Sequence, residues 1–215
     1  MTGLTEQTEQ WAGEFGRSYT ERNDLGLEGL DQLYQTQFGI SRSELNTRFL
    51  GTLPRDLSIL EVGCNVGNQL ALLTSMGFTH LTGMDIQDYA LARAKERLPQ
   101  ATLLQGSALA LPFPDNVFDL VFTSGVLIHI HPSHLPTVFR EVCRVSQSMI
   151  WGLEYFAETP TEIPYHGQRQ LLWKAPFADL YRQYCPRLTL VREERLPYLN
   201  NTANVDSMYL LRKEE

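Results

Sequence analysis

From about Leu57 onward the chain alternates short apolar runs with longer amphipathic segments, and this alternation restricts the fold more than any other feature. The short runs contain the β-branched residues that favour strands, whereas the longer segments have the spacing of helices. Alternating strands and helices build a mostly parallel sheet with helices on its faces. The predicted strands span residues 58–62, 80–84, 102–105, 118–124 and 148–154, and the predicted helices span 68–75, 88–97 and 132–145.

The two ends of the chain depart from this pattern. Residues 188–195 and 207–211 alternate apolar with polar side chains and predict an antiparallel pair at the end of the sheet. Residues 27–34 and 42–50 have helical periodicity, and we expect a lid over the carboxyl edge of the sheet. The predicted fold is a Rossmann-like three-layer α/β sandwich, with a mostly parallel seven-stranded sheet, an antiparallel C-terminal strand and a helical N-terminal lid. We expect one domain over residues 1–215, with the lid at 1–50, the core at 57–154 and a cap with the antiparallel strands at 155–215.

Charge and composition argue against several classes of partner. The formal net charge of −7 repels polyanions, and Lys and Arg do not cluster, so we expect no nucleic-acid partner. No apolar run approaches the ~20 residues that span a bilayer, and the first residues lack the pattern of a signal peptide. We therefore expect a cytoplasmic protein without membrane contact, with no metal site and with Cys64, Cys143 and Cys185 as reduced thiols. The sequence predicts no oligomeric state.

The strongest local motif is a turn with two glycines after the first predicted strand, Glu61-Val-Gly63-Cys-Asn-Val-Gly67. Glycine lets a ligand approach the backbone closely at the carboxyl end of a parallel strand. An ordinary strand-to-helix turn is the alternative interpretation. Asp85 ends the next strand about twenty residues later, where a carboxylate can accept hydrogen bonds from both hydroxyls of a ribose. Its alternative role is a helix N-cap, for which Asp88 is better placed.

Residues 60–130, which contain these motifs, resemble the cofactor-binding half of class I S-adenosylmethionine-dependent methyltransferases. Gly106-Ser-Ala108 before Leu111-Pro-Phe, and then Phe118-Asp-Leu-Val, complete the resemblance. It implies S-adenosyl-L-methionine as cofactor. By the same resemblance, the loop residues Gly63, Cys64, Asn65 and Gly67 lie against its methionine part, Asp85 with Ile86 holds the ribose, Ser107 and Ala108 lie beside adenine, and Ser124 and Gly125 face the sulfonium.

Two positions depart from the usual pattern of that family. Asn65 replaces the middle glycine of the loop, which argues against a dinucleotide enzyme because a pyrophosphate needs close contact with backbone amides. Ser107 stands where an acidic residue is common, and its hydroxyl can still accept a hydrogen bond from the adenine amine.

A finer resemblance, to methylases associated with pseudaminic acid biosynthesis, rests on residues 11–23, 125–130, 154–155 and 163–167. In related methyltransferases an aromatic residue and an arginine ahead of the core hold the cofactor carboxylate. Tyr19 and Arg22 match those roles here, and Arg22 can make a bidentate, charge-assisted contact. A solvated helix residue is the alternative interpretation of Arg22.

Several residues are candidates for contact with the methyl acceptor. His129 follows the fourth predicted strand, and an ordinary pKa near 6.5 would suit a general base, although a structural histidine is equally compatible with the pattern. Glu154 and Tyr155 are the other catalytic candidates. The predicted acceptor-binding residues are Trp11, His129, Tyr165, His166 and Arg169.

The sequence thus predicts an enzyme, a methyltransferase that acts on oxygen or nitrogen of a small molecule such as a sugar, a sugar acid or an amine. Two alternatives remain open, a protein or RNA methyltransferase and a regulatory protein that binds the cofactor without turnover. A nicotinamide-dependent oxidoreductase shares the fold, but Asn65 and the antiparallel end of the sheet count against it.

Overall fold

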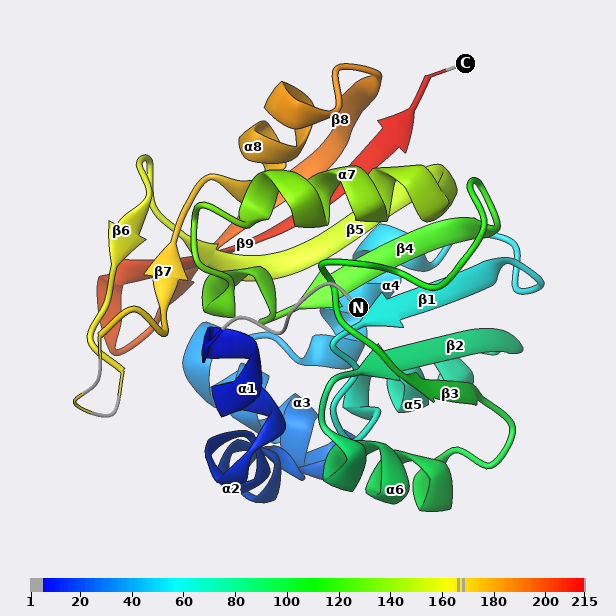
Figure 1. Cartoon of the computed structure of the whole chain (residues 1–215), viewed down its shortest axis with the longest axis horizontal. Coiled ribbons are helices and arrows are strands. Elements are labelled where there is room, and N and C mark those ends of the chain that lie inside the picture. The colour runs from blue at the N-terminus through cyan, green and yellow to red at the C-terminus, as the bar shows by residue number, and fades with distance from the viewer. Residues whose placement is uncertain (1–5, 166, 168, 215) are drawn as a thin grey trace.

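The structure is a computed structural model that describes residues 6–165, 167 and 169–214 (Figure 1). Its elements follow one another along the chain as α1 (Glu6–Ala12), α2 (Glu14–Asn23), α3 (Gly26–Phe38), α4 (Arg42–Leu50), β1 (Ser58–Val62), α5 (Asn68–Ser75), β2 (His80–Asp85), α6 (Asp88–Arg97), β3 (Thr102–Gln105), β4 (Phe118–Ser124), the 3-10 turn η1 (Leu127–His129), α7 (Leu135–Val145), β5 (Ser146–Phe156), β6 (Thr161–Glu162), β7 (Trp173–Lys174), α8 (Phe177–Tyr184), β8 (Leu188–Tyr198) and β9 (Asn201–Lys213).

Seven of the strands form one sheet in the order β3-β2-β1-β4-β5-β9-β8. The first five strands of that order pair in parallel, and β9 runs antiparallel to both β5 and β8. The predicted fold is therefore confirmed, with β9 as the reversed strand. Because parallel strands end at the same edge, the loops after β1, β2 and β4 meet there.

Apolar side chains cover the sheet on both faces. On one face α7 and α8 pack against Val121, Ile150 and Leu211, and on the other α4 and α5 pack against Ile59 and Leu120 (Figure 1). The apolar residues of α7 recur at three- and four-residue spacing, which gives the helix one buried stripe. Within the described residues, no helix combines the length and the apolar character that crossing a bilayer requires.

The N-terminal helices divide into two groups. Leu45 and Leu50 of α4 are fully buried in the core on one face of the sheet, so this helix belongs to the core layer. Helices α1 and α2, which the sequence did not predict, lie at the carboxyl ends of the strands (Figure 1). They approach closely because Gly16 lacks a Cβ, which would otherwise lie 1.8 Å from the carbonyl oxygen of Trp11.

The C-terminal strands are longer than the sequence predicted. Strand β9 begins at Asn201 and β8 ends at Tyr198, so much of the polar stretch between the two predicted strands, residues 196–206, is itself paired. The missed helix α8 precedes them and buries Phe177 and Tyr181 against α7. Pairing with neighbouring strands supplies the hydrogen bonds that hold this polar stretch extended, and local sequence does not reveal it.

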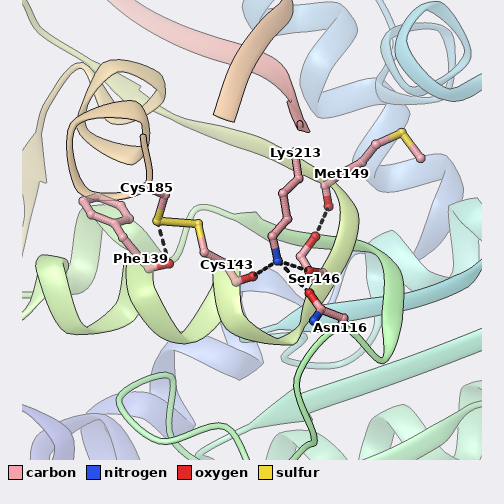
Figure 2. Close-up of a disulfide and its surroundings, with 7 residues drawn as sticks. All are labelled: Asn116, Phe139, Cys143, Ser146, Met149, Cys185 and Lys213. Atoms are coloured by element: carbon pink, nitrogen blue, oxygen red, sulfur yellow. Dashed lines mark hydrogen bonds between the residues drawn. A yellow bond between two sulfur atoms is a disulfide. The ribbon is translucent and has the colours of Figure 1, made fainter. Parts of the chain in front are cut away.

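The cysteines correct one prediction. Cys143 of α7 is joined to Cys185, just beyond α8, by a disulfide (Figure 2). Cys64 is a buried free thiol. The two sulfur atoms meet because α7 and α8 pack side by side, which 42 residues of sequence separation conceal. Lys213 ties the same corner together, since its ammonium donates to the carbonyl oxygens of Cys143 and Ser146 at 3.0 and 2.9 Å.

Replacing Cys143 with serine is expected to lower the free energy of unfolding by about 3 kcal/mol, because the disulfide restricts the unfolded chain. Urea unfolding of both proteins without reductant measures this difference. The control is the same comparison with excess dithiothreitol, where neither protein has the bond and the curves should coincide. Equal stability of the two proteins under oxidising conditions would contradict a structural disulfide.

Candidate active site

A cavity of about 580 Å³ opens at the carboxyl edge of the sheet. Its described lining comes from the ends of β1, β2 and β4, from α1 to α3, from the C-terminal ends of β5 and β8, and from Asp206 near the middle of β9. The predicted residues that line it are Trp11, Tyr19, Arg22, Gly63, Cys64, Asn65, Asp85, Ile86, Ser107, Ala108, Ser124, Gly125, His129, Tyr155 and Tyr165.

The turn after β1 forms the floor of this cavity. Gly63 has a φ of 77°, and its backbone N–H donates to the carbonyl oxygen of Met84 at 2.7 Å. A Cβ at this position would lie 2.5 Å from the side chain of Val126. Asn65 also has a left-handed φ, of 47°, and its side-chain oxygen accepts from the N–H of Val66 at 2.7 Å, which explains how a non-glycine residue occupies the middle of the loop.

Gly67 was predicted to contact the cofactor, but it lies outside the cavity lining. It is the N-cap of α5 with a φ of 75°. A Cβ there would lie 2.6 Å from Leu98, so the position is glycine because α5 packs closely on the residue that ends α6. Burial of Cys64 raises the pKa of its thiol well above the usual value, so the thiol stays protonated at neutral pH.

Asp85 stands at the carboxyl end of β2 with both oxygens directed at backbone. One oxygen accepts from the N–H of Asn65 at 2.8 Å and the other from the N–H of Gln87 at 2.8 Å. A carboxylate has about four lone-pair sites, so each oxygen retains capacity for a further donor. Burial raises the pKa of Asp85, and the backbone donors oppose that change.

The residue that caps α6 corrects another prediction. Gln87, and not Asp88, is the N-cap, because its side-chain oxygen accepts from the N–H of Tyr89. Its amide nitrogen donates to the carbonyl oxygens of Ala12 and Gly13 at 3.1 and 3.0 Å, which fastens the connection between α1 and α2 to the cavity edge. Glutamine is an unusual cap, so no local signal pointed to it.

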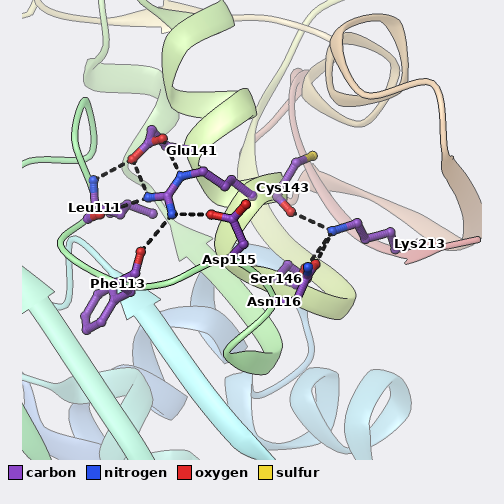
Figure 3. A network of polar contacts seen from close by, with 9 residues as sticks. Leu111, Phe113, Asp115, Asn116, Glu141, Cys143, Ser146 and Lys213 are labelled. Atoms are coloured by element: carbon purple, nitrogen blue, oxygen red, sulfur yellow. Dashed lines mark hydrogen bonds and ion pairs between the residues drawn. The ribbon is translucent and has the colours of Figure 1, made fainter. Parts of the chain in front are cut away.

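The loop that carries Ser107 and Ala108 is held by α7, which shares one core cluster with it. Arg144 of α7 donates to the carbonyl oxygens of Leu111 and Phe113 at 2.9 and 2.7 Å, and Glu141 accepts from the N–H of Leu111 (Figure 3). Arg144 also pairs with Glu141 at 2.8 Å and with Asp115 at 2.9 Å. The sequence did not single out Arg144, because its partners in the loop, Leu111, Phe113 and Asp115, lie about thirty residues away.

Aromatic rings form one wall of the cavity. The ring of His129 lies 4.4 Å from that of Trp11, 5.8 Å from Tyr19 and 5.4 Å from Tyr165. Three parts of the chain that are far apart in sequence, namely the first two helices, the turn at His129 and the segment at Tyr165, thus meet at one place. Burial raises the pKa of the Tyr19 hydroxyl, which therefore stays protonated at neutral pH.

His129 is 9% exposed, and its Nδ1 lies 2.8 Å from the carbonyl oxygen of Leu171. A carbonyl only accepts, so Nδ1 carries the proton and Nε2 carries a lone pair. Burial lowers the pKa of His129 to about 4. The imidazole is therefore neutral at pH 7, and it is a weaker base than its ordinary pKa suggested.

This burial predicts a pH-dependent stability that His129→Gln removes. The unfolded chain takes up the proton near pH 6.5, whereas the folded protein takes it up at about 4, so falling pH favours the unfolded state between these values. Relative to the variant, the wild type should lose about 1.4 kcal/mol per pH unit as the pH falls through this window. Urea unfolding at several pH values checks it, with His80→Gln, at the exposed start of β2, as the control. Parallel profiles for wild type and His129→Gln would contradict a buried neutral histidine.

The remaining residues predicted to contact the methyl acceptor differ in whether they line the cavity. Glu154 is 1% exposed and does not line the cavity; its carboxylate accepts from the N–H groups of Val126 and Ile128 at 3.2 and 3.4 Å. It thereby holds the turn that carries His129, and the expected direct catalytic contact of Glu154 does not fit this geometry. Burial raises its pKa to about 7.

Tyr155 does line the cavity, and burial raises the pKa of its hydroxyl to about 12, so it can donate a hydrogen bond at neutral pH. Arg169 is exposed and lies outside the lining. His166 lies outside the described residues. Arg22 is exposed at the mouth of the cavity.

Arg42 is a buried cation that the sequence analysis missed. It is fully buried, and it donates to Tyr34 Oη at 2.7 Å, to Asn46 Oδ1 at 2.9 Å and to Ser124 Oγ at 3.2 Å. Its guanidinium also lies 5.5 Å from the ring of Trp151. This set of contacts fastens α3 and α4 to the end of β4.

Two buried acids also line the cavity without having been predicted, Glu61 of β1 and Asp206 of β9. Each has one carboxylate oxygen that lacks a hydrogen-bond partner within the described structure. Asp206 precedes the predicted strand at 207–211, so its place in the sheet was not visible in the pattern. Across the described part of the chain, no three His, Cys, Asp or Glu side chains form a group that could hold a metal ion.

Comparison with known proteins agrees with this arrangement. Residues 59–148 match a family described as a methyltransferase domain. Over 87 residues the chain is 40% identical to an uncharacterized methyltransferase from Synechocystis. The aligned segment covers 40% of this chain and 41% of that protein. Over 95 residues it is 36% identical to a sterol 24-C-methyltransferase of Gibberella zeae, covering 41% of this chain and 24% of the relative. The chain thus aligns with less than half the length of either relative.

A solved structure shares the fold over the whole chain. It is the 1,6-didemethyltoxoflavin-N1-methyltransferase of Burkholderia thailandensis, solved with bound 1,6-didemethyltoxoflavin and S-adenosylhomocysteine. The TM-score is 0.73 at 18% identity, with 100% of this chain and 92% of that chain covered. Residues 59–148 are thus similar in sequence to a methyltransferase domain, and the chain shares its fold with a solved methyltransferase.

Proposed function

We propose that this protein is an S-adenosylmethionine-dependent methyltransferase that transfers a methyl group to oxygen or nitrogen of a small molecule, such as a sugar, a sugar acid or an amine. The observation that carries the proposal is the position of Asp85 at one end of a cavity of about 580 Å³. It lies beside the turn at Gly63, where the missing Cβ leaves the backbone accessible to a ligand. The match of residues 59–148 to a methyltransferase domain supports it.

The residues at this end fit the cofactor. Asp85 retains lone pairs for two ribose hydroxyls, and the missing Cβ of Gly63 leaves room for a ligand against the backbone. Ser107 and Ala108 would lie beside adenine, and Tyr19 and Arg22 at the cavity mouth would hold the carboxylate. When bound, S-adenosylmethionine supplies a methyl group that is already activated by its sulfonium.

The protein's own contribution is then exclusion of water and orientation. The rings of Trp11, Tyr19 and Tyr165 cover one wall, and proximity and alignment of reactants can supply much of the acceleration of a displacement. The neutral His129 would accept a hydrogen bond from the acceptor through Nε2, while Tyr155 would donate one. Because the pKa of His129 is low, we assign it orientation of the acceptor in preference to proton removal.

The acceptor is proposed to be a small molecule because the cavity is bounded by rings on one side and by the sheet on the other. The likeness of residues 11–23 and 163–167 to methylases associated with pseudaminic acid biosynthesis favours a sugar-type acceptor, and the relatives acting on sterols show how widely acceptors vary within this fold.

Calorimetric titration with S-adenosylmethionine, S-adenosylhomocysteine and NADH tests the proposal. We expect binding of the first two and none of NADH. An acceptor screen over amino sugars, sugar acids and amines, with production of S-adenosylhomocysteine as the readout, then tests turnover. A preference for NADH, or no binding of either adenosyl compound, would overturn the methyltransferase assignment. Binding without turnover on any acceptor would favour the regulatory alternative.

A further inference from the structure

Asp206 lies at the end of the cavity remote from the ribose site. It belongs to β9, where it pairs with Tyr155 of β5 and Leu196 of β8. The residues proposed to hold the cofactor come from β1, β2, β4 and the loop after β3, on the other side of β5 in the sheet order. Because Asp206 and Tyr155 line the same cavity, this end is where an acceptor would lie.

The carboxylate of Asp206 is buried without adequate partners. The residue is 5% exposed; Oδ1 has no hydrogen-bond partner within the described chain, and Oδ2 accepts from Tyr198 Oη only at the long distance of 3.5 Å. A buried carboxylate normally accepts several hydrogen bonds or pairs with a cation, and leaving it unpaired costs stability. Glu154, by contrast, accepts from two backbone N–H groups.

The nearby cations are engaged elsewhere. Arg42 donates to Tyr34, Asn46 and Ser124, and Lys174 donates to Asn204 Oδ1 at 2.6 Å. Both lower the pKa of Asp206 through space, but within the described residues neither forms an ion pair with it. Asp206 therefore lines the cavity with a carboxylate oxygen that has no partner within the described residues, as Glu61 does in β1.

The rings around Asp206 are of a kind that suits a cation. Tyr34 of α3, Tyr155 of β5 and Tyr198 of β8 line this end of the cavity together with it. Aromatic faces attract ammonium groups, and a carboxylate among such rings adds a charge-assisted hydrogen bond. An anionic acceptor would be repelled at the same place.

We propose that Asp206 anchors a protonated amine of the methyl acceptor, and that the substrate is accordingly a small molecule with a cationic nitrogen. This inference rests on the proposed methyltransferase function. A protonated amine has no free lone pair, so it serves as a handle, and the methyl group goes to another oxygen or nitrogen atom of the same molecule. Burial raises the pKa of Asp206 to about 7, and a bound cation would favour its ionised form.

The test compares benzylamine with benzyl alcohol, which have nearly the same shape but differ in charge. Each is titrated by calorimetry into protein saturated with S-adenosylhomocysteine. We expect benzylamine to bind about tenfold more tightly, as one charge-assisted hydrogen bond allows. In Asp206→Asn this preference should fall to within about twofold, while the affinity for S-adenosylhomocysteine stays that of the wild type.

A matched control is Glu193→Gln, which removes one carboxylate from the neighbouring strand. Glu193 accepts from Ser207 Oγ at 2.6 Å and does not line the cavity, so its variant should keep the amine preference. Asp206→Ser provides a second neutral variant should asparagine prevent folding, because serine is smaller and cannot overpack the site.

Several results would overturn the proposal. They are equal binding of the two probes to the wild type, no detectable binding of benzylamine, tighter binding of benzoate, or an amine preference that survives in the Asp206 variants. Failure of the wild type to bind S-adenosylhomocysteine is a separate result, which removes the proposed function and this inference with it. The cofactor titration, made first, therefore distinguishes the two failures.

Discussion

Asp85→Ala is expected to weaken S-adenosylhomocysteine binding by a factor on the order of 100 or more, because the variant loses hydrogen bonds to two ribose hydroxyls, each worth about 1.5–3 kcal/mol with a charged acceptor. The variant also leaves the N–H groups of Asn65 and Gln87 without their acceptor, which loosens the loop beside the ligand. Calorimetry on wild type and variant measures the change.

Asp88→Ala is the matched control, since Asp88 is an exposed acid three residues further along, at the start of α6. It should bind S-adenosylhomocysteine within about twofold of the wild type, as expected for an exposed substitution. Similar losses in the two variants would show that general charge near the cavity, and not a ribose contact at Asp85, governs binding.

Gly63→Ala should lower the free energy of unfolding by about 3 kcal/mol. Two costs add here: a non-glycine residue at a φ of 77°, and a Cβ placed 2.5 Å from the side chain of Val126. Urea unfolding measures the loss. Because the same Cβ would stand on the cavity floor, binding of S-adenosylhomocysteine should also weaken.

Gly125→Ala separates the two costs. Gly125 has a φ of 66°, close to that of Gly63, but no atom lies within 4 Å of where its Cβ would be. Its loss of stability should therefore be about 1 kcal/mol, the cost of backbone strain alone. If both variants lose the same amount, the close approach of Val126 contributes nothing and the account of Gly63 fails.

The residues at the proposed cofactor end of the cavity could be grouped from the sequence because their signals are local. A strand, a glycine turn and a helix follow one another within a dozen residues, and Asp85 is placed by the end of the next strand. Gly67 shows the limit of this reasoning. Its role in packing α5 against Leu98 depends on a helix thirty residues away, so the motif alone suggested a ligand contact.

The acceptor end was less predictable because its chemistry depends on burial. His129 was correctly expected beside the carboxyl edge, but desolvation lowers its pKa to about 4 and so changes what it can do. Glu154 does not line the cavity, and its carboxylate accepts hydrogen bonds from the backbone N–H groups of Val126 and Ile128. Neither fact follows from residue type or position.

The sequence by itself determined the alternating α/β order, the mostly parallel sheet and the loop residues at one edge, since hydrophobic periodicity and glycine turns act over short stretches of chain. Only the tertiary structure decided the partners of distant groups: the Cys143–Cys185 bond, the Arg144 contacts with the carbonyl oxygens of Leu111 and Phe113, and the position of Asp206 at the cavity. These depend on which elements pack together and on how much water they exclude, and both are properties of the assembled fold.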